Sequence, residues 1–245
     1  MTVINAEKVA AIIWAADHEA DAAVYRASVF GQALLAGIVA ELRAAGVQRI
    51  GIIATAPVKA ELSGRIDAKV TWLPDEQSLD FGQAIIQTED WLKGFEGDIL
   101  LVDGTSPFVD RWLFLRLWEG LKGEAMVGCL PVTKLRGEGQ YDRIIRNSEG
   151  QIVSVLPAKE VPQHISGNEI TGLPYCFEWD CLQRALYQVE TPDGRRPLQA
   201  VVEKVTDNGF RVNSLPLKNF LPLVKARSEQ ELQNIRAKLK EMIDD

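Results

Sequence analysis

The chain has 245 residues, of which 47% are hydrophobic and 25% are charged, and these proportions exclude a disordered or fibrous protein. The formal net charge of −7 disfavours nucleic acid and anionic membrane as partners, because phosphate groups attract clustered Lys and Arg. No apolar run approaches about 20 residues, and the first residues lack the pattern of a secretory signal. The three Cys have no metal-type spacing, so we expect reduced thiols in a cytoplasmic protein.

The first half of the chain alternates strands with helices. Continuous apolar runs, typical of strands buried on both faces, predict strands at 9–15, 49–55, 68–73, 98–104 and 124–132. Helical spacing of apolar residues predicts helices at 29–46, 57–64, 79–95 and 108–121. This alternation predicts right-handed βαβ units and a parallel sheet.

The pattern changes after residue 135. A turn at 147–150 between two short apolar runs predicts a β-hairpin over 141–157. Helices at 178–189, 198–209 and 228–243 and a strand at 210–217 follow, and Ser228 with Glu231 forms a capping-box pattern. We therefore predict one domain over 1–245. Its predicted class is α/β, a three-layer α/β/α arrangement with a mostly parallel, Rossmann-like mixed sheet and an inserted β-hairpin region.

In an open α/β sheet, ligands bind beyond the carboxyl ends of the strands. These ends are predicted at 14–21, 55–57, 74–81, 103–107 and 131–134. The cleft is therefore expected there, whatever its ligand.

Several strings near these ends resemble motifs of the GT-A-like nucleotidyltransferases, which transfer a nucleotidyl group from a nucleoside triphosphate to a sugar or polyol phosphate. The stretch WAADHEAD (14–21) stands where N-acetylglucosamine-1-phosphate uridylyltransferases have a Gly-rich loop followed by Arg. The stretches at 139–160 and 168–177 resemble the sugar-site hairpin and the Glu-Ile-Asn-Thr-Gly segment of that branch. The strings VDGTSPF and LVKARSEQEL resemble two motifs of the methylerythritol-phosphate cytidylyltransferases.

The resemblance implies roles for individual residues. Asp103 matches the family's Mg²⁺-binding Asp, and Lys225 matches its catalytic Lys. The implied nucleotide-binding residues are Ala15, Ala16, Asp17 and Gly82, and the implied residues on the sugar-phosphate side are Tyr141, Arg143, Lys159 and Gly172. The implied partners are a nucleotide and a sugar or polyol phosphate, with Mg²⁺ as cofactor if the protein is active and none otherwise. An apolar patch in the inserted region would serve a homodimer.

The predicted phosphate loop departs from the family pattern. Asp17 and Glu19 replace glycines, and Asp21 replaces the Arg. A triphosphate carries roughly four negative charges, and each close like-charge contact opposes its binding by about 1–4 kcal/mol. Two interpretations stay open: a helix cap and first turn with Asp17 as the cap, or a remodelled binding loop.

Asp103, the candidate metal ligand, and Lys225, the candidate catalytic residue, also have ordinary structural explanations. Asp103 would hold Mg²⁺ at the strand tip, or it would satisfy N–H groups of its own Asp-Gly turn. Lys225 would contact the α-phosphate, or it would be a solvated loop residue.

Two main functional hypotheses follow from these residues. The chain is either a nucleotidyltransferase with an atypical loop or a non-catalytic relative that serves binding, regulation or assembly. A glycosyltransferase is a third hypothesis, which predicts an Asp-x-Asp-like pair, whereas VDGTS supplies one acid.

Overall fold

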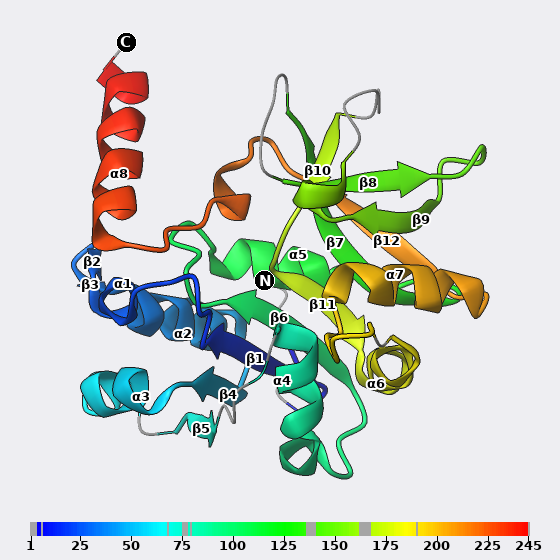
Figure 1. The fold of residues 1–245 in the computed structure, drawn as a ribbon, viewed down its shortest axis with the longest axis horizontal. Coiled ribbons are helices and arrows are strands. Elements are labelled where there is room, and N and C mark those ends of the chain that lie inside the picture. The colour runs from blue at the N-terminus through cyan, green and yellow to red at the C-terminus, as the bar shows by residue number, and fades with distance from the viewer. Residues whose placement is uncertain are drawn as a thin grey trace.

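The structure is a computed structural model that describes residues 4–5, 7–67, 69–74, 78, 80–135, 141–161, 168–189 and 191–244. Figure 1 shows a twisted sheet with helices packed on both of its faces. The strands are β1 (Val9–Ala15), β2 (Ser28–Val29), β3 (Gln32–Ala33), β4 (Arg49–Ala54), β5 (Thr71–Pro74), β6 (Asp98–Asp103), β7 (Met126–Lys134), β8 (Asp142–Arg146), β9 (Ile152–Leu156), β10 (Glu169–Thr171), β11 (Tyr175–Glu178) and β12 (Arg211–Pro216).

The helices alternate with these strands along most of the chain. The α-helices are α1 (Ala22–Arg26), α2 (Leu34–Ala45), α3 (Ala56–Leu62), α4 (Phe81–Gln87), α5 (Arg111–Glu119), α6 (Trp179–Gln188), α7 (Leu198–Asp207) and α8 (Glu229–Asp244). The 3₁₀ helices are η1 (Glu89–Leu92), η2 (Ala158–Glu160) and η3 (Leu221–Leu223). Among the described helices, none is both long and apolar enough to cross a bilayer.

Two hydrophobic cores lie on opposite faces of the sheet. Residues of α1, α2, α3, α5 and α8 contribute to one core, and residues of α4, α6 and α7 contribute to the other. Alternate residues of β1 enter the two cores, with Ile13 in the first and Ile12 in the second, because successive side chains of a strand point to opposite faces. The predicted three-layer α/β/α arrangement is therefore confirmed.

The sheet is parallel in its first half and mixed in its second. Its order over the described residues is β5-β4-β1-β6-β11-β7-β10-β8-β9, with β12 paired to β7. The strands β5, β4, β1 and β6 are mutually parallel, whereas β11 lies antiparallel between β6 and β7. The predicted hairpin is confirmed as β8 and β9, and it extends the sheet through β10. The short strands β10 and β11 were not predicted.

The predicted helix over 29–46 is wrong at its beginning. Residues 28–33 form the small β2–β3 hairpin, whose turn places Phe30 at φ 49° and Gly31 at φ 88°. Helix α2 begins only at Leu34, and its left-handed C-cap Gly46 is the last residue of the predicted range. The predicted helix over 79–95 is likewise divided, into α4 and η1.

The start of α8 differs from a complete capping box. Ser228 Oγ accepts a hydrogen bond from the Glu231 N–H at 3.1 Å, as predicted. The Glu231 carboxylate instead accepts from the Arg227 N–H at 2.8 Å, one residue earlier than the motif requires. Glu231 therefore fixes the backbone just before the helix.

Candidate functional site

The site is built on two adjacent parallel strands. Trp14 of β1 lies in register with Asp103 of β6, so both strands end at the same edge of the sheet. The Gly104 N–H then donates to the Trp14 carbonyl at 2.9 Å and continues the ladder by one bond. A Cβ on Gly104 would lie 2.8 Å from that carbonyl oxygen, so the close approach of the two strand ends requires a glycine.

Asp103 is fully buried at this edge, and both of its carboxylate oxygens are engaged. Oδ1 accepts hydrogen bonds from the Thr105 N–H at 2.9 Å and the Thr105 hydroxyl at 2.6 Å. Oδ2 lies 2.7 Å from Nζ of Lys225. Burial raises the pKa of Asp103, but the Lys225 ammonium and the Thr105 hydrogen bonds outweigh it and hold this pKa below its usual value. The carboxylate therefore stays ionised, and it also satisfies its own turn, as the structural interpretation of Asp103 predicted.

Lys225 is not a solvated loop residue, so that interpretation is wrong. Its ammonium is the counter-ion of Asp103, and its side chain is 35% exposed. Burial lowers the pKa of Lys225, but the charge of Asp103 and the hydrogen bond to it, and then the charge of Asp142, raise this pKa above its usual value. The two residues that matched family motifs at distant points of the chain are therefore in direct contact.

The acidic stretch after β1 is a tight turn, and Asp17 does not cap a helix, so the interpretation with Asp17 as the cap is wrong. Asp21 occupies the N-cap position of α1, but its side chain makes no capping hydrogen bond. Helix α1 begins only at Ala22, and it has no acidic residue in its first turn. Asp17 closes the turn itself: its Oδ1 accepts from the Glu19 N–H at 2.9 Å, and its carbonyl accepts from the Ala20 N–H at 3.1 Å. The Asp21 N–H donates to the Arg227 carbonyl at 2.8 Å. Three consecutive N–H groups of the turn thus already have acceptors within the protein.

Arg227 holds the acidic turn in place, and the sequence reasoning did not identify it. Its Nε lies 3.5 Å from Asp17 Oδ2, and its Nη2 lies 3.0 Å from Glu19 Oε2. The Ala226 N–H donates to the Thr105 carbonyl at 2.9 Å. Residues 225–227, which we call the strap, therefore fasten the ends of both strands. The sequence did contain a signal, because Lys225 and Arg227 are two residues apart. Side chains with this spacing lie on the same side of an extended segment.

Two further contacts surround the turn. His18 Nε2 donates to the Ser78 carbonyl at 3.0 Å, and Lys159 Nζ lies 3.7 Å from Glu19 Oε1. Lys159 belongs to η2, which follows the inserted hairpin, so its contact joins the two predicted sides of the cleft. The structure thereby brings predicted residues from both sides together, although Lys159 and Glu19 are largely exposed.

The other residues predicted for the sugar-phosphate side are Arg143, Tyr141 and Gly172, and Arg143 is described first. Arg143 is buried on β8 opposite Ile170 of β10, and its Nη1 has no hydrogen-bond partner among the described residues. Its neighbour Asp142 raises the Lys225 pKa, and consecutive side chains of a strand point to opposite faces. Arg143 therefore points away from the face that carries Asp142.

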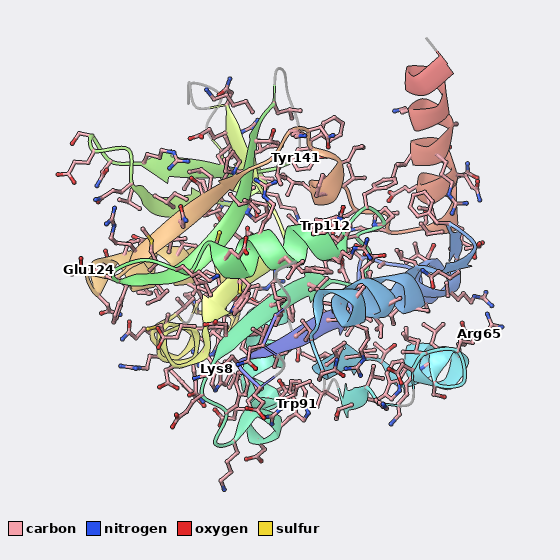
Figure 2. All side chains as sticks on the ribbon, turned by 180° about the vertical axis from the view of Figure 1, so that it is seen from behind. Lys8, Arg65, Trp91, Trp112, Glu124 and Tyr141 are labelled. Atoms are coloured by element: carbon pink, nitrogen blue, oxygen red, sulfur yellow. The ribbon has the colours of Figure 1, made fainter. Side chains whose placement is uncertain are left out.

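Tyr141 and Gly172 flank this region. Tyr141 precedes β8 and Gly172 follows β10, and their neighbours Asp142 and Thr171 are in register. Figure 2 labels Tyr141 in the upper part of the molecule and Lys8, the residue before β1, in the lower part. Burial raises the pKa of the Tyr141 hydroxyl. Among the described residues, a Cβ on Gly172 would meet Leu223 alone, at 3.9 Å, so packing against them does not require a glycine there.

Gly82 has a structural reason to be glycine. A Cβ on this residue of α4 would lie 1.9 Å from the Arg196 carbonyl oxygen. Arg196 is itself fixed, because its N–H donates to Asp80 Oδ2 at 2.7 Å. The loop before α7 therefore covers Gly82, and the predicted contact with a nucleobase stays a prediction.

The arrangement around Asp103 does not fit a divalent metal ion as it stands. Mg²⁺ takes oxygen ligands at about 2.0–2.1 Å, commonly one or two carboxylates together with phosphates and water. The Lys225 ammonium already lies 2.7 Å from Asp103 Oδ2 as its counter-ion. Among the described residues, no group of three or more His, Cys, Asp or Glu side chains is placed to hold a metal ion. The Mg²⁺ role of Asp103 therefore requires Lys225 to move away first.

The chain is similar to known proteins in sequence and in fold. No family model matches the chain. It is 22% identical over 219 residues to the bifunctional protein GlmU of Clostridium tetani, with 88% of this chain and 48% of that protein covered. It is 26% identical over 198 residues to GlmU of Lactobacillus delbrueckii subsp. bulgaricus, with 78% and 42% covered. The chain thus spans about half the length of these curated relatives.

Solved structures with the same fold cover nearly the whole chain. A Bacillus anthracis protein assigned as a glucose-1-phosphate thymidylyltransferase superposes with a TM-score of 0.73 at 13% identity, covering 94% of both chains. CMP:2-keto-3-deoxy-manno-octonic acid synthetase, in complex with CTP, gives 0.69 at 12% identity, covering 96% of this chain and 99% of that one. The 4-diphosphocytidyl-2C-methyl-D-erythritol synthase of Anaerococcus prevotii gives 0.66 at 15% identity, covering 96% and 100%. The predicted resemblance is confirmed: the chain has the nucleotidyltransferase fold and is related to the sugar-phosphate nucleotidyltransferases.

Proposed function

We propose that this chain is a non-catalytic member of the nucleotidyltransferase fold, which uses its cleft for binding or regulation and does not transfer a nucleotidyl group. The observation that carries the proposal is the hydrogen bonding within the turn after β1. Its N–H groups at Glu19, Ala20 and Asp21 are already bonded to oxygens of the protein. A loop that holds a triphosphate needs such N–H groups free to point at phosphate oxygens.

Charge supports the same proposal. A triphosphate at this turn would meet the carboxylates of Asp17 and Glu19, and each close contact would oppose binding by about 1–4 kcal/mol. The neighbouring cations are Arg227 and Lys159, and both already pair with these carboxylates. They would have to leave the carboxylates before they could bind a phosphate group and offset the repulsion. The acidic side chains thus take the partners that phosphate groups would otherwise use.

A second candidate function is nucleotidyl transfer with an atypical loop. The observation that favours it is the contact between Asp103 and Lys225, both of which match family motifs. Activity would require an incoming nucleotide to displace Arg227 from the turn. It would also require Lys225 to release Asp103 so that a cation could bind there.

The first test is thermal unfolding with Mg²⁺ and each of CTP, UTP, GTP, ATP and dTTP at millimolar concentration. A nucleotide with micromolar affinity would stabilise the fold by about 4 kcal/mol, and we expect a shift far below this value. Pyrophosphate release with a panel of sugar and polyol phosphates is measured in parallel, and we expect none. Nucleotide-dependent turnover that disappears in Asp103→Ala would establish the second candidate instead.

A double variant tests whether the acidic turn is the cause. Asp17→Asn with Glu19→Gln removes both charges while an amide oxygen remains at residue 17 to close the turn. We expect this variant to bind nucleoside triphosphates at least about tenfold more tightly than the natural chain, since about 1.4 kcal/mol of repulsion corresponds to a factor of ten. Asp193→Asn with Glu149→Gln, at exposed positions in other loops, is the matched control. Equal affinity of the two double variants would contradict the role of charge and would leave the bonded N–H groups as the basis of the proposal.

A further inference from the structure

The buried ion pair at the tip of β6 carries an inference about the cation that this cleft uses. We propose that Lys225 is the built-in counter-ion of Asp103 and takes the position that a divalent metal ion would otherwise hold, so that the cleft binds its ligand without a metal. This inference does not rest on the turn after β1, which carries the proposed function. It conflicts with the second candidate function, which needs a cation at Asp103.

Each oxygen of the carboxylate has a partner without a metal, Oδ1 through hydrogen bonds and Oδ2 through an ion pair. Thr105 supplies two hydrogen bonds to Oδ1, and Lys225 Nζ lies 2.7 Å from Oδ2. A metal ion on Oδ2 would lie about 2 Å from that oxygen. The ammonium and a divalent cation would then compete for the same side of one oxygen, at a separation where like charges repel strongly.

The backbone holds Lys225 in this position. Ala226 is fully buried, and its N–H bonds to the Thr105 carbonyl, two residues beyond Asp103. One residue further along, the Arg227 carbonyl accepts the Asp21 N–H, and the Arg227 N–H bonds to Glu231. Before the lysine, the Val224 N–H donates to the Leu221 carbonyl at 3.0 Å, so the backbone is fixed on both sides of Lys225. Any movement that opened Oδ2 to a metal ion would have to come from the lysine side chain alone.

An ammonium and a divalent ion offer different chemistry to a ligand. The ammonium carries one charge and three N–H donors on a flexible stem. A divalent ion carries two charges and binds several oxygens at once in a fixed octahedron. A cleft with Lys225 in this position is suited to a ligand that places a single group near Asp103. That group would form hydrogen bonds or carry little charge. The cleft does not suit a metal-bound polyphosphate.

The inference is tested with Mn²⁺ alone, because this ion takes the same oxygen ligands as Mg²⁺ and the free ion is counted directly by electron paramagnetic resonance. We expect the natural chain to leave Mn²⁺ free at concentrations at which Lys225→Ala binds one ion, with an affinity at least tenfold tighter. Adding Asp103→Asn to Lys225→Ala should abolish the gain. Lys225→Arg, which keeps the positive charge, and Lys218→Ala, at an exposed residue after β12, should both behave like the natural chain.

Two results would overturn the inference. One is binding of Mn²⁺ by the natural chain that disappears in Asp103→Asn. The other is a Lys225→Ala chain that folds, as judged by circular dichroism, yet gains no Mn²⁺ site. If Lys225→Ala is unfolded without metal, the same titration is followed by circular dichroism: folding on addition of Mn²⁺ supports the inference. If Mn²⁺ does not fold Lys225→Ala, Mn²⁺ binding is compared between the natural chain and Asp103→Asn. Binding by the natural chain that disappears in Asp103→Asn would then overturn the inference, and no binding by the natural chain would support it.

Discussion

The ends of β1 and β6 lie side by side at one edge of the sheet, and both carry carboxylates neutralised by the strap. They differ in burial. The Asp103 side chain is fully buried, whereas the Glu19 side chain is 56% exposed and the Asp17 side chain is 10% exposed. A buried charge without its partner is costly, whereas an exposed ion pair contributes little. The comparison teaches that stability constrains the residue at the β6 end, whereas the residues of the β1 turn can vary with function.

The largest effect is expected at the buried end. Lys225→Ala leaves the Asp103 carboxylate buried without a counter-ion, and such changes lower the free energy of unfolding by about 3–5 kcal/mol. Urea unfolding in the presence of a chelator measures this change. The double variant Lys225→Ala with Asp103→Asn should recover part of the loss. A loss below about 1 kcal/mol would mean that the Asp103–Lys225 ion pair stabilises the fold no more than an exposed ion pair does.

The pH dependence of the same pair sharpens the comparison. The lowered pKa of Asp103 means that its contribution is present above the ordinary value of 3.8 and is lost as the pH falls through the lower folded value. The raised pKa of Lys225 means that its contribution is present below 10.5 and is lost as the pH rises through the higher folded value. The difference in unfolding free energy between the natural chain and Asp103→Asn should therefore be constant near neutral pH and should shrink below about pH 4. If this difference in unfolding free energy grew as the pH fell below about 4, the predicted direction would be contradicted.

A smaller effect is expected at Asp17. Asp17→Ala removes the hydrogen bond to the Glu19 N–H and one partner of Arg227, and we expect a loss of about 1 kcal/mol. Asp17→Asn keeps the oxygen and removes the charge, so it separates the two contributions. We expect it to recover more than half of the loss, because the hydrogen bond is shorter than the contact with Arg227. Equal losses in the two variants would assign the effect to charge.

The smallest effect is expected at Lys159. Its side chain is 90% exposed and lies 3.7 Å from Glu19, so Lys159→Ala should change the free energy of unfolding by no more than about 0.5 kcal/mol. The measurement is urea unfolding at low and high salt, since screening should remove whatever effect is present. A loss as large as that of Lys225→Ala would show that exposure does not separate the two ends.

Much of the fold could be predicted from the sequence, because local patterns determine it. Strand β1 was predicted with its observed bounds, and the hairpin of β8 and β9 followed from its turn residues. The β2–β3 hairpin was missed because apolar residues at helical spacing cover it, and Phe30 gives no sign of its positive φ. Strands β10 and β11 are three and four residues long, and their pairing with distant strands is invisible to local periodicity.

The candidate site could be predicted only in parts. The resemblance identified Asp103 and Lys225 separately, but no local pattern joins residues so far apart in the chain. Arg227 was overlooked because an exposed Arg in a loop is common, and only the folded chain shows its two acidic partners. The acidic turn was correctly located, but its closure by Asp17 depends on a backbone geometry that residue type alone does not determine.

The position of the strap late in the chain has a consequence for how the protein folds. The edge of the sheet formed by β1 and β6 is built from residues synthesised early, whereas its counter-ions arrive only with residues 225 and 227. Contacts between such distant segments form slowly, because a long loop must close before they contribute. Until then Asp103 has no counter-ion among the described residues, so the sheet edge is expected to be among the last regions to reach its native state. A nascent chain that pauses before the strap would be exposed to proteases and chaperones at this edge.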